Sequence, residues 1–425
     1  MDVEGGLLGG RRLYVVGVLT LVYAVSIIDR QIVIILQDQL KLEFSLNDKQ
    51  LGLMTGPAFV VLYLAAGLLI APLADRHNRR TLVAASVIVW SAATAAAGLA
   101  QSYIQLVLAR AGVGVGEAGS GPAAYSMIAD MYPDGKRGLP TSIFSSGVYL
   151  GILTGLAGGG WLGAILGWRR TLVVLGVFGL AVGVLVRLSV AEPTRRSTDQ
   201  SGAAELPFRE VVRTLGAAPG IIHLLIGSSL FSMAGNGAVS FMPPFLLRLH
   251  AMDVAHVGLW LGIIIGCGGA IGSAVSGVVA DRLCGNVLAR YPLLIGFALL
   301  LAVPFYVAAF LAPTGAWALG LFVVPALLYP VYLTPSLMVL YRVVPPRARA
   351  RAVAVLLSTF TGVALGFGPM VVGALSDYFG ARMGPEGLRI ALIVSVSISS
   401  AWALIHFWLA HVAMRRCADS NSAIA

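Results

Sequence analysis

Long apolar stretches separated by short polar breaks run along the whole chain. Each stretch has about 20 residues or more, which as a helix rising 1.5 Å per residue crosses a hydrocarbon core of about 30 Å. Because lipid offers no hydrogen bonds to open backbone groups, we predict that these stretches are helices. The twelve predicted spans are Leu13–Leu36, Leu51–Leu73, Thr81–Ala100, Tyr103–Met131, Leu139–Leu166, Thr171–Val190, Ile221–Leu247, Val257–Ala280, Leu288–Leu311, Trp317–Leu340, Ala352–Leu375 and Leu388–Ala413.

The composition excludes a water-soluble fold. Of the 425 residues, 58% are hydrophobic and only 11% are charged, whereas an average soluble domain has about 25% charged residues. The first span is long, contains Asp29-Arg30 and is not followed by a small-residue cleavage site, so we expect it to be retained. The three cysteines lack metal or redox spacing and the six histidines are scattered, so no metal or cofactor is expected.

The Lys and Arg residues are divided unequally between the two sides of the predicted spans. One set of loops, with both chain ends, carries 20 of the 29 basic residues, the other set carries 7, and Arg30 and Arg110 lie inside spans. The positive-inside rule then places both termini in the cytoplasm of a multi-pass protein of the cell inner (plasma) membrane. Basic loops facing anionic lipid explain the net charge of +10, so we expect no nucleic-acid partner.

The longest polar break divides the spans into six and six. We predict an N-terminal six-helix bundle over residues 1–190, a cytoplasmic linker over 191–220 and a C-terminal six-helix bundle over 221–425. Within the linker, Leu206–Leu215 is either a short helix on the membrane surface or a plain solvated segment.

Two sequence matches indicate that the two halves are repeats of one unit. Ala74-Asp75-Arg76 after the second span recurs as Ala280-Asp281-Arg282 after the eighth, 281 − 75 = 206 residues later, and glycine-rich runs recur in the fifth and eleventh spans. Matches at nearly one offset predict two pseudo-symmetric six-helix bundles, with a transport site between them.

The run ADRHNRR over residues 74–80, with its weaker repeat, resembles the loop signature of the major facilitator superfamily. Asp29-Arg30 and the run RAGVGVGEAGSGPAAYSMIADMYP over residues 110–133 resemble the spinster-like lipid transporters within it. The first resemblance implies that charges near the cytoplasmic face hold the two halves together. The residues implied for this cytoplasmic gate are Asp75, Arg76, Arg80, Asp281 and Arg282.

Four ionisable side chains fall inside predicted spans, where each costs at least about 2.5 kcal/mol. They are Asp29, Arg30, Arg110 and Glu117, and their formal charges sum to zero. Arg110 and Glu117 are seven residues apart and therefore share a helix face within about 20°. Burial favours a neutral acid and a nearby arginine favours the carboxylate, so we predict that Asp29 and Glu117 take part in proton coupling, with the carrier of the proton left open between them. The alternative is a static ion-pair network, and the choice between symport and antiport stays open.

An apolar chamber with one small charged cluster suits an amphipathic molecule. The residues predicted to bind it are Arg30, Arg110, Glu117, Asn236, Tyr329 and Tyr332. The spinster resemblance implies a lipid of the lysophospholipid or sphingoid-phosphate type. We therefore predict a monomeric, proton-coupled secondary transporter of such a lipid that works by alternating access.

Two further possibilities stay open. The same charged cluster also suits a small organic anion as substrate, and a sensor or scaffold without transport activity is not excluded. An enzyme is not expected, because the chain has neither a Gly-x-Ser-x-Gly nor a His-Glu-x-x-His motif.

Overall fold

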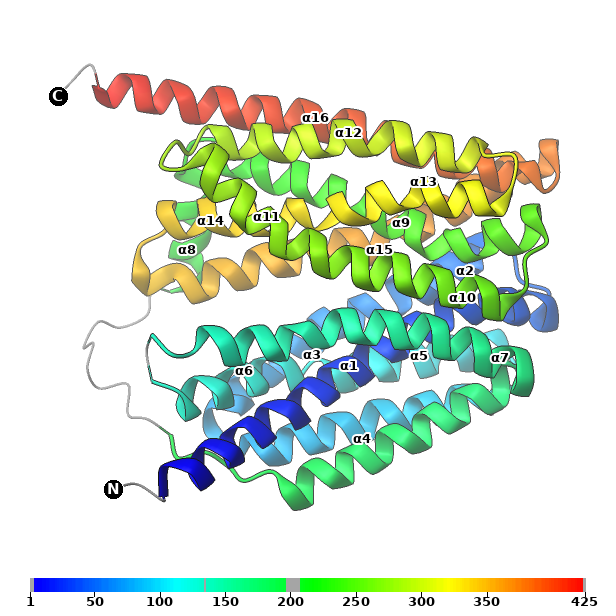
Figure 1. The fold of residues 1–425 in the computed structure, drawn as a ribbon, viewed down its shortest axis with the longest axis horizontal. Helices are drawn as coiled ribbons and strands as arrows, with labels where there is room; N and C mark the ends of the chain where they lie inside the picture. Colours follow the sequence, from blue (N-terminus) through cyan, green and yellow to red (C-terminus); the bar gives the residue numbers. More distant parts are fainter. Residues whose placement is uncertain (1–3, 134, 196–206, 423–425) are drawn as a thin grey trace. The chain divides into compact units, whose positions relative to one another are not determined.

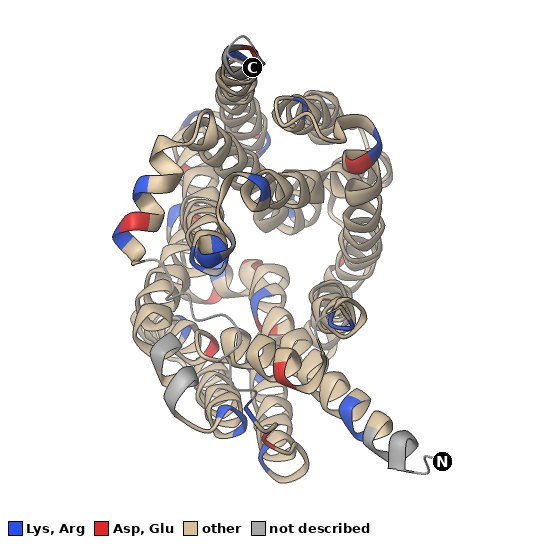
Figure 2. Cartoon of the chain, turned by 90° about the vertical axis from the view of Figure 1, so that its left-hand side faces the viewer, with Lys and Arg blue, Asp and Glu red and all other residues tan. Residues whose placement is uncertain are grey.

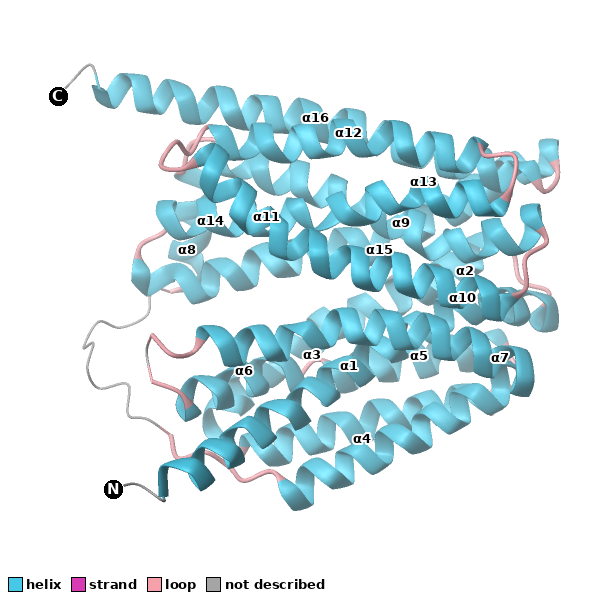
Figure 3. Ribbon diagram, viewed as in Figure 1, coloured by secondary structure: helices cyan, strands magenta, loops and turns pink. Residues whose placement is uncertain are grey.

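The computed structural model describes residues 4–133, 135–195 and 207–422. Within these residues every regular element is a helix and there is no strand (Figure 3). Among the described residues, ten helical segments are long and apolar enough to cross a membrane. Lys, Arg, Asp and Glu occupy only a small part of the ribbon, as Figure 2 shows. The predicted all-α membrane fold is confirmed.

The twelve predicted spans all have helical counterparts among the described residues. Helix α7 (Gly138–Ser189) contains the fifth and sixth spans, because Gly167 turns the chain with φ 72° and ψ 166°. A positive φ of this size favours glycine. The fourth span is divided into α5 (Tyr103–Glu117) and α6 (Ser120–Met131), which is why it is absent from the ten long segments.

The chain forms two compact units, drawn with their helices labelled in Figure 1. The first unit consists of Met1–Leu46, Leu53–Gln200 and Met252–Gly266. Here α7 packs against both α1 and α4, and α5 packs against both α3 and α4. Besides α5, α6 and α7, its helices are α1 (Glu4–Phe44), α3 (Pro57–Arg76), α4 (Arg79–Gly98) and α10 (Val254–Leu261), which is followed by a π-helical turn at Gly262–Cys267.

The second unit consists of Asn47–Gly52, Ser201–Ala251 and Cys267–Ala425. Here α9 packs against α15 and α16, and α12 packs against α13 and α16. Its helices are α8 (Phe208–Ala217), α9 (Ile221–His250), α11 (Gly268–Cys284), α12 (Arg290–Leu311), α13 (Gly315–Leu328), α14 (Leu333–Val343), α15 (Arg349–Met383), α16 (Glu386–Ser422) and the start of α2 (Asp48–Thr55), with 3-10 turns at Tyr329–Tyr332 and Pro346–Ala348.

Helix α8 lies within the predicted linker, where a surface helix and a solvated segment were both open. Its Val211 and Leu215 side chains are buried, whereas Phe208 and Val212 are exposed. Apolar side chains four residues apart occupy the same helix face, so α8 is held in the second unit by one stripe.

Candidate functional site

Helix α5 presents a buried face that carries two of the four membrane-embedded charges. Leu106, Arg110, Val113 and Glu117 recur at spacings of three and four residues, and all four are buried. This is the spacing at which side chains share one face of an α-helix. Apolar positions within the same stripe therefore place Arg110 and Glu117 against the neighbouring helices.

Arg30 of α1 forms an ion pair with Glu117. Its Nε donates to Glu117 Oε2 at 2.9 Å, and its Nη2 donates to the same oxygen. The Glu117 side chain is 1% exposed, whereas that of Arg30 is 21% exposed. The carboxylate of this pair is therefore buried, whereas the arginine is partly accessible.

Asp29 lies in a different environment from its neighbour Arg30. It is 1% exposed, and the Thr94 hydroxyl of α4 lies 2.8 and 2.7 Å from its two carboxylate oxygens. Successive helix positions point about 100° apart, so Asp29 contacts α4 while Arg30 contacts α5.

An aromatic pair on α3 covers both guanidinium groups. The Arg30 Cζ atom lies 4.7 Å from the Phe59 ring centroid and 5.4 Å from that of Tyr63. The Arg110 Cζ atom lies 5.4 Å from the Phe59 centroid. Such distances are those of cation–π contacts, which are stronger where water is excluded.

Two buried polar atoms of this cluster have no hydrogen-bond partner among the described residues. They are Arg110 Nε, a donor, and Glu117 Oε1, an acceptor. Buried polar groups are usually paired. The cluster therefore offers a donor and an acceptor to a small molecule or to water.

The second unit brings its three predicted binding residues together. Asn236 Nδ2 donates to the Tyr329 hydroxyl oxygen and to the Ser232 carbonyl oxygen, the latter at 3.1 Å. Tyr332 lies beside Tyr329, with ring centroids 5.3 Å apart. Phe231 and Phe360 also pack against Tyr332. One amide and two phenols thus form a polar group within an aromatic wall.

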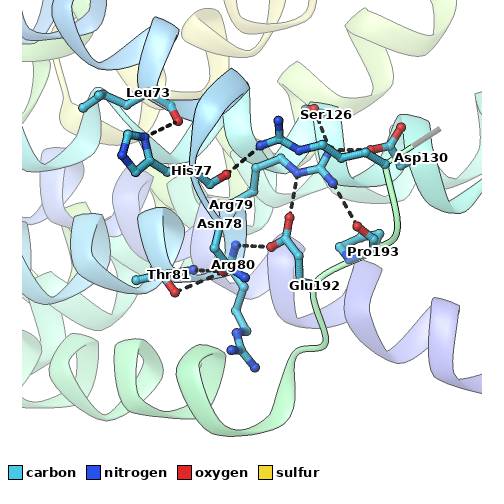
Figure 4. A network of polar contacts seen from close by, with 11 residues as sticks. Leu73, His77, Asn78, Arg79, Arg80, Thr81, Ser126, Asp130, Glu192 and Pro193 are labelled. Atoms are coloured by element: carbon cyan, nitrogen blue, oxygen red, sulfur yellow. Dashed lines mark hydrogen bonds and ion pairs between the residues drawn. The ribbon is translucent and has the colours of Figure 1, made fainter. Parts of the chain in front are cut away.

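The first residue of α4 is a buried arginine that the sequence did not single out. Arg79 is 2% exposed and donates from Nε to Glu192 Oε1 at 2.9 Å and from Nη2 to the Pro193 carbonyl oxygen at 3.0 Å (Figure 4). Its Nη1 donates to Ser126 Oγ at 2.9 Å and to Asp130. Arg79 therefore connects the start of α4, the end of α6 and the first linker residues.

The five residues predicted for the cytoplasmic gate occupy different environments. The side chains of Asp75 and Arg76, at the end of α3, lie outside the described part of the structure. The Arg80 backbone N–H donates to Glu192 Oε2 at 2.7 Å. Asp281 and Arg282 are exposed near the end of α11. Three arginines occur within residues 76–80, and the run alone does not show which is buried.

The helices that span the membrane and the charges buried among them define a polytopic membrane protein built for transport. The family model described as Major Facilitator Superfamily matches residues 19–356. A solved bacterial homologue of the human lysosomal transporter Spinster, inward-facing and unoccupied, is 32% identical with a TM-score of 0.85, over 94% of this chain and 97% of the other. The chain belongs to the major facilitator superfamily and to its spinster-like members, as predicted, and it is a transporter and not an enzyme.

Three curated relatives differ in what their names say they transport. An MFS-type efflux pump of Mycolicibacterium smegmatis is 32% identical over 96% of this chain and 95% of the relative. The sphingosine-1-phosphate transporter SPNS2 of Danio rerio is 28% identical over 85% of this chain and 75% of the relative. A probable L-galactonate transporter of Escherichia coli is 25% identical over 64% of this chain and 63% of the relative.

Proposed function

We propose that this transporter moves an amphipathic lipid with an anionic head group, of the lysophospholipid or sphingoid-phosphate type, by proton-coupled alternating access. The observation that carries the proposal is the Arg30–Glu117 ion pair, whose arginine is partly accessible and lies against two aromatic rings. A phosphate group is a good partner for a planar guanidinium, because it accepts two parallel hydrogen bonds.

Charge balance connects head-group binding to proton uptake. When an anionic head group takes over Arg30, Glu117 loses the partner of its Oε2 atom, while its Oε1 atom already has none among the described residues. An ionised carboxylate buried without a partner is strongly unfavourable, so Glu117 takes up a proton. The second buried acid, Asp29, keeps its Thr94 hydrogen bond and is the other candidate carrier.

The aromatic residues of both units suit an acyl tail. Phe59 and Tyr63 cover the arginines in the first unit, and Phe231, Tyr332 and Phe360 pack together in the second. Large flat apolar side chains bury much surface with little loss of conformational entropy. The name of the relative SPNS2, a sphingosine-1-phosphate transporter, also supports a lipid substrate.

A small organic anion is the second candidate substrate. The same arginines suit a carboxylate, and the similarity to a probable L-galactonate transporter favours this class. A sugar acid needs partners for several hydroxyls, since each unpaired buried hydroxyl is costly. A lysophospholipid carries an acyl tail and a sugar acid does not, so the dependence of uptake on the acyl tail distinguishes the two candidate substrates.

The test compares two lysophospholipids with the same head group and different acyl lengths, and the free glycerophosphate head group, in uptake by proteoliposomes. The proposal predicts that uptake of the long-chain lipid saturates and that excess glycerophosphate inhibits it weakly. Equal affinity for the head group alone, or saturable uptake of a sugar acid but not of the lipid, would contradict the lipid assignment.

We further propose that the transporter is a monomer with both termini in the cytoplasm. The 20 basic residues assigned to one set of loops, against 7 on the other, support this orientation. Reporter fusions to either end test it, and activity of a periplasmic reporter at the C-terminus would contradict it.

A further inference from the structure

A short segment between the first two spans is docked in the second unit. Residues 47–52 belong to that unit, whereas Leu46 and Leu53 on either side belong to the first. The chain therefore enters the second unit for six residues and returns. In the orientation proposed above, this docked segment lies on the extracytoplasmic side.

The Asp48 side chain is held at three points within the second unit. The side chain is 5% exposed, and both of its carboxylate oxygens lie 2.9 Å from Arg248 Nη1 of α9. Its Oδ2 also accepts from Ser376 Oγ of α15 at 2.6 Å. A buried acid with an arginine and a hydroxyl is well compensated, and losing either partner is costly.

Asp377 caps the docked segment from a distant helix. Its Oδ1 accepts from the Asp48 backbone N–H and its Oδ2 from that of Lys49, both at 2.9 Å. These N–H groups open α2 and have no partner within their own helix. A carboxylate at a helix N-terminus also interacts favourably with the helix dipole. Asn47 caps α2 locally, because its Oδ1 accepts from the Gln50 N–H at 2.8 Å. Asp377 adds a second cap from a remote helix.

The backbones of the docked segment and α15 approach very closely. A Cβ atom at Gly52 would lie 2.4 Å from the Pro369 carbonyl oxygen, and one at Gly373 would lie 2.2 Å from that of Asp48. Contacts this close require glycine at both positions and hold the segment against α15 along its length.

Among the described residues, the corresponding segment of the second repeat has no such remote polar partners. Val254 follows Asp48 by 254 − 48 = 206 residues, the offset found between Asp75 and Asp281. It lies in the first unit against α7, where a Cβ atom at Gly160 would approach the Val254 carbonyl oxygen to 2.5 Å. Helix α10 has the same kind of local cap as α2, with Asp253 Oδ1 accepting from the His256 N–H at 3.0 Å, but no counterpart of Asp377 among the described residues. Within the part of the chain that the structure describes, the polar docking is therefore specific to the first repeat.

We infer that Asp48, Arg248, Ser376 and Asp377 form an extracytoplasmic gate, with Asp377 as a positioning residue that acts through α2. While Asp377 caps α2, the docked segment stays in the second unit. Opening of the transporter to the outside requires the segment to leave, which exposes two backbone N–H groups and separates Asp48 from Arg248. This gate operates whatever the substrate is, so it does not depend on the lipid proposed above.

The first experiment measures hydrogen–deuterium exchange of residues 48–52 in the full-length protein without substrate, for Asp377→Ala and the matched control Asp253→Ala. Loss of the two remote capping hydrogen bonds predicts exchange about fivefold faster or more in this segment for Asp377→Ala, although the local cap at Asn47 remains. Asp253→Ala should accelerate exchange only at the start of α10. Unchanged exchange of residues 48–52 in Asp377→Ala would overturn the inference.

The second experiment distinguishes a gate from a simple helix cap. Leu51 is fully buried, so a Leu51→Cys variant with the native cysteines replaced reports release of the segment through labelling by an impermeant maleimide. Asp377→Ala, or the milder Ser376→Ala if that variant does not fold, should label several-fold faster. Faster exchange with unchanged labelling would show a cap alone and would overturn the gate.

Discussion

Asp29 and Arg30 are adjacent in α1, yet their side chains contact different helices: Asp29 accepts from Thr94 of α4, and Arg30 donates to Glu117 of α5. The two buried acids of the first unit are thus held by different partners, a hydroxyl and a guanidinium. Because the partners differ, substitutions can separate a proton carrier from an acid that only stabilises the helix packing.

Arg30→Lys tests the head-group partner. A lysine keeps the charge but loses the planar fork and most of the stacking on Phe59 and Tyr63, so we expect lipid affinity to fall about tenfold. The measurement is the concentration dependence of uptake, with Arg415→Lys, an exposed site near the C-terminus, as the control. Unchanged affinity in Arg30→Lys would rule out a bidentate head-group contact.

Thr94→Val tests how Asp29 is held. The substitution keeps the shape and removes the hydroxyl that lies within 2.8 Å of both Asp29 oxygens. We expect a loss of stability of about 1–3 kcal/mol, seen as a lower melting temperature. Thr154→Val is the control, since that hydroxyl is exposed and donates only to the Leu150 carbonyl of its own helix. Equal melting temperatures for the two variants would show that the Asp29 contact is unimportant.

Tyr329→Phe tests the polar group of the second unit. Without the hydroxyl, Asn236 Nδ2 loses one of its two acceptors while the ring packing on Phe231 and Tyr332 remains. We expect uptake affinity to fall about three- to tenfold, with Tyr378→Phe, at an exposed tyrosine, unchanged. A normal Tyr329→Phe transporter would remove this group from the proposed binding site.

The spans were predictable, because an apolar stretch of membrane length has few possible structures other than a transmembrane helix. The positions at which these helices are interrupted were not predictable. Helix α1 continues through polar residues to Phe44, beyond the predicted end at Leu36, because a helix does not stop where hydropathy falls. The break between Glu117 and Ser120 and the turn at Gly167 lie in glycine-containing runs that resemble uninterrupted spans.

The candidate site was partly predictable for a related reason. A charge inside an apolar span is conspicuous, so Asp29, Arg30, Arg110 and Glu117 were found. Their partner Thr94 was not found, because a threonine in a membrane helix is common. Arg79 was missed because it lies beside other arginines, and only the fold brings Asp130 and Glu192 to it.

Arg79→Ala tests this cytoplasmic network. The change leaves Asp130 and Glu192 without their shared arginine and empties a nearly fully buried position. We expect a loss of about 2–4 kcal/mol in stability. We also expect faster proteolysis at the linker, because Arg79 binds its residues Glu192 and Pro193. The exposed Arg415→Ala is the control. A melting temperature equal to that of the control would show that the network contributes nothing measurable.

The most direct test of the central claim is lysophospholipid uptake into proteoliposomes over a series of imposed pH differences. The comparison includes the wild type, Glu117→Gln and Glu43→Gln, the last altering an acid that pairs with Arg169 outside the cluster. Proton-coupled transport through the Arg30–Glu117 pair predicts that wild type and Glu43→Gln respond to the pH difference, while Glu117→Gln transports with a flat response. A full response in both Glu117→Gln and Asp29→Asn would show that these carboxylates are structural and would contradict the mechanism.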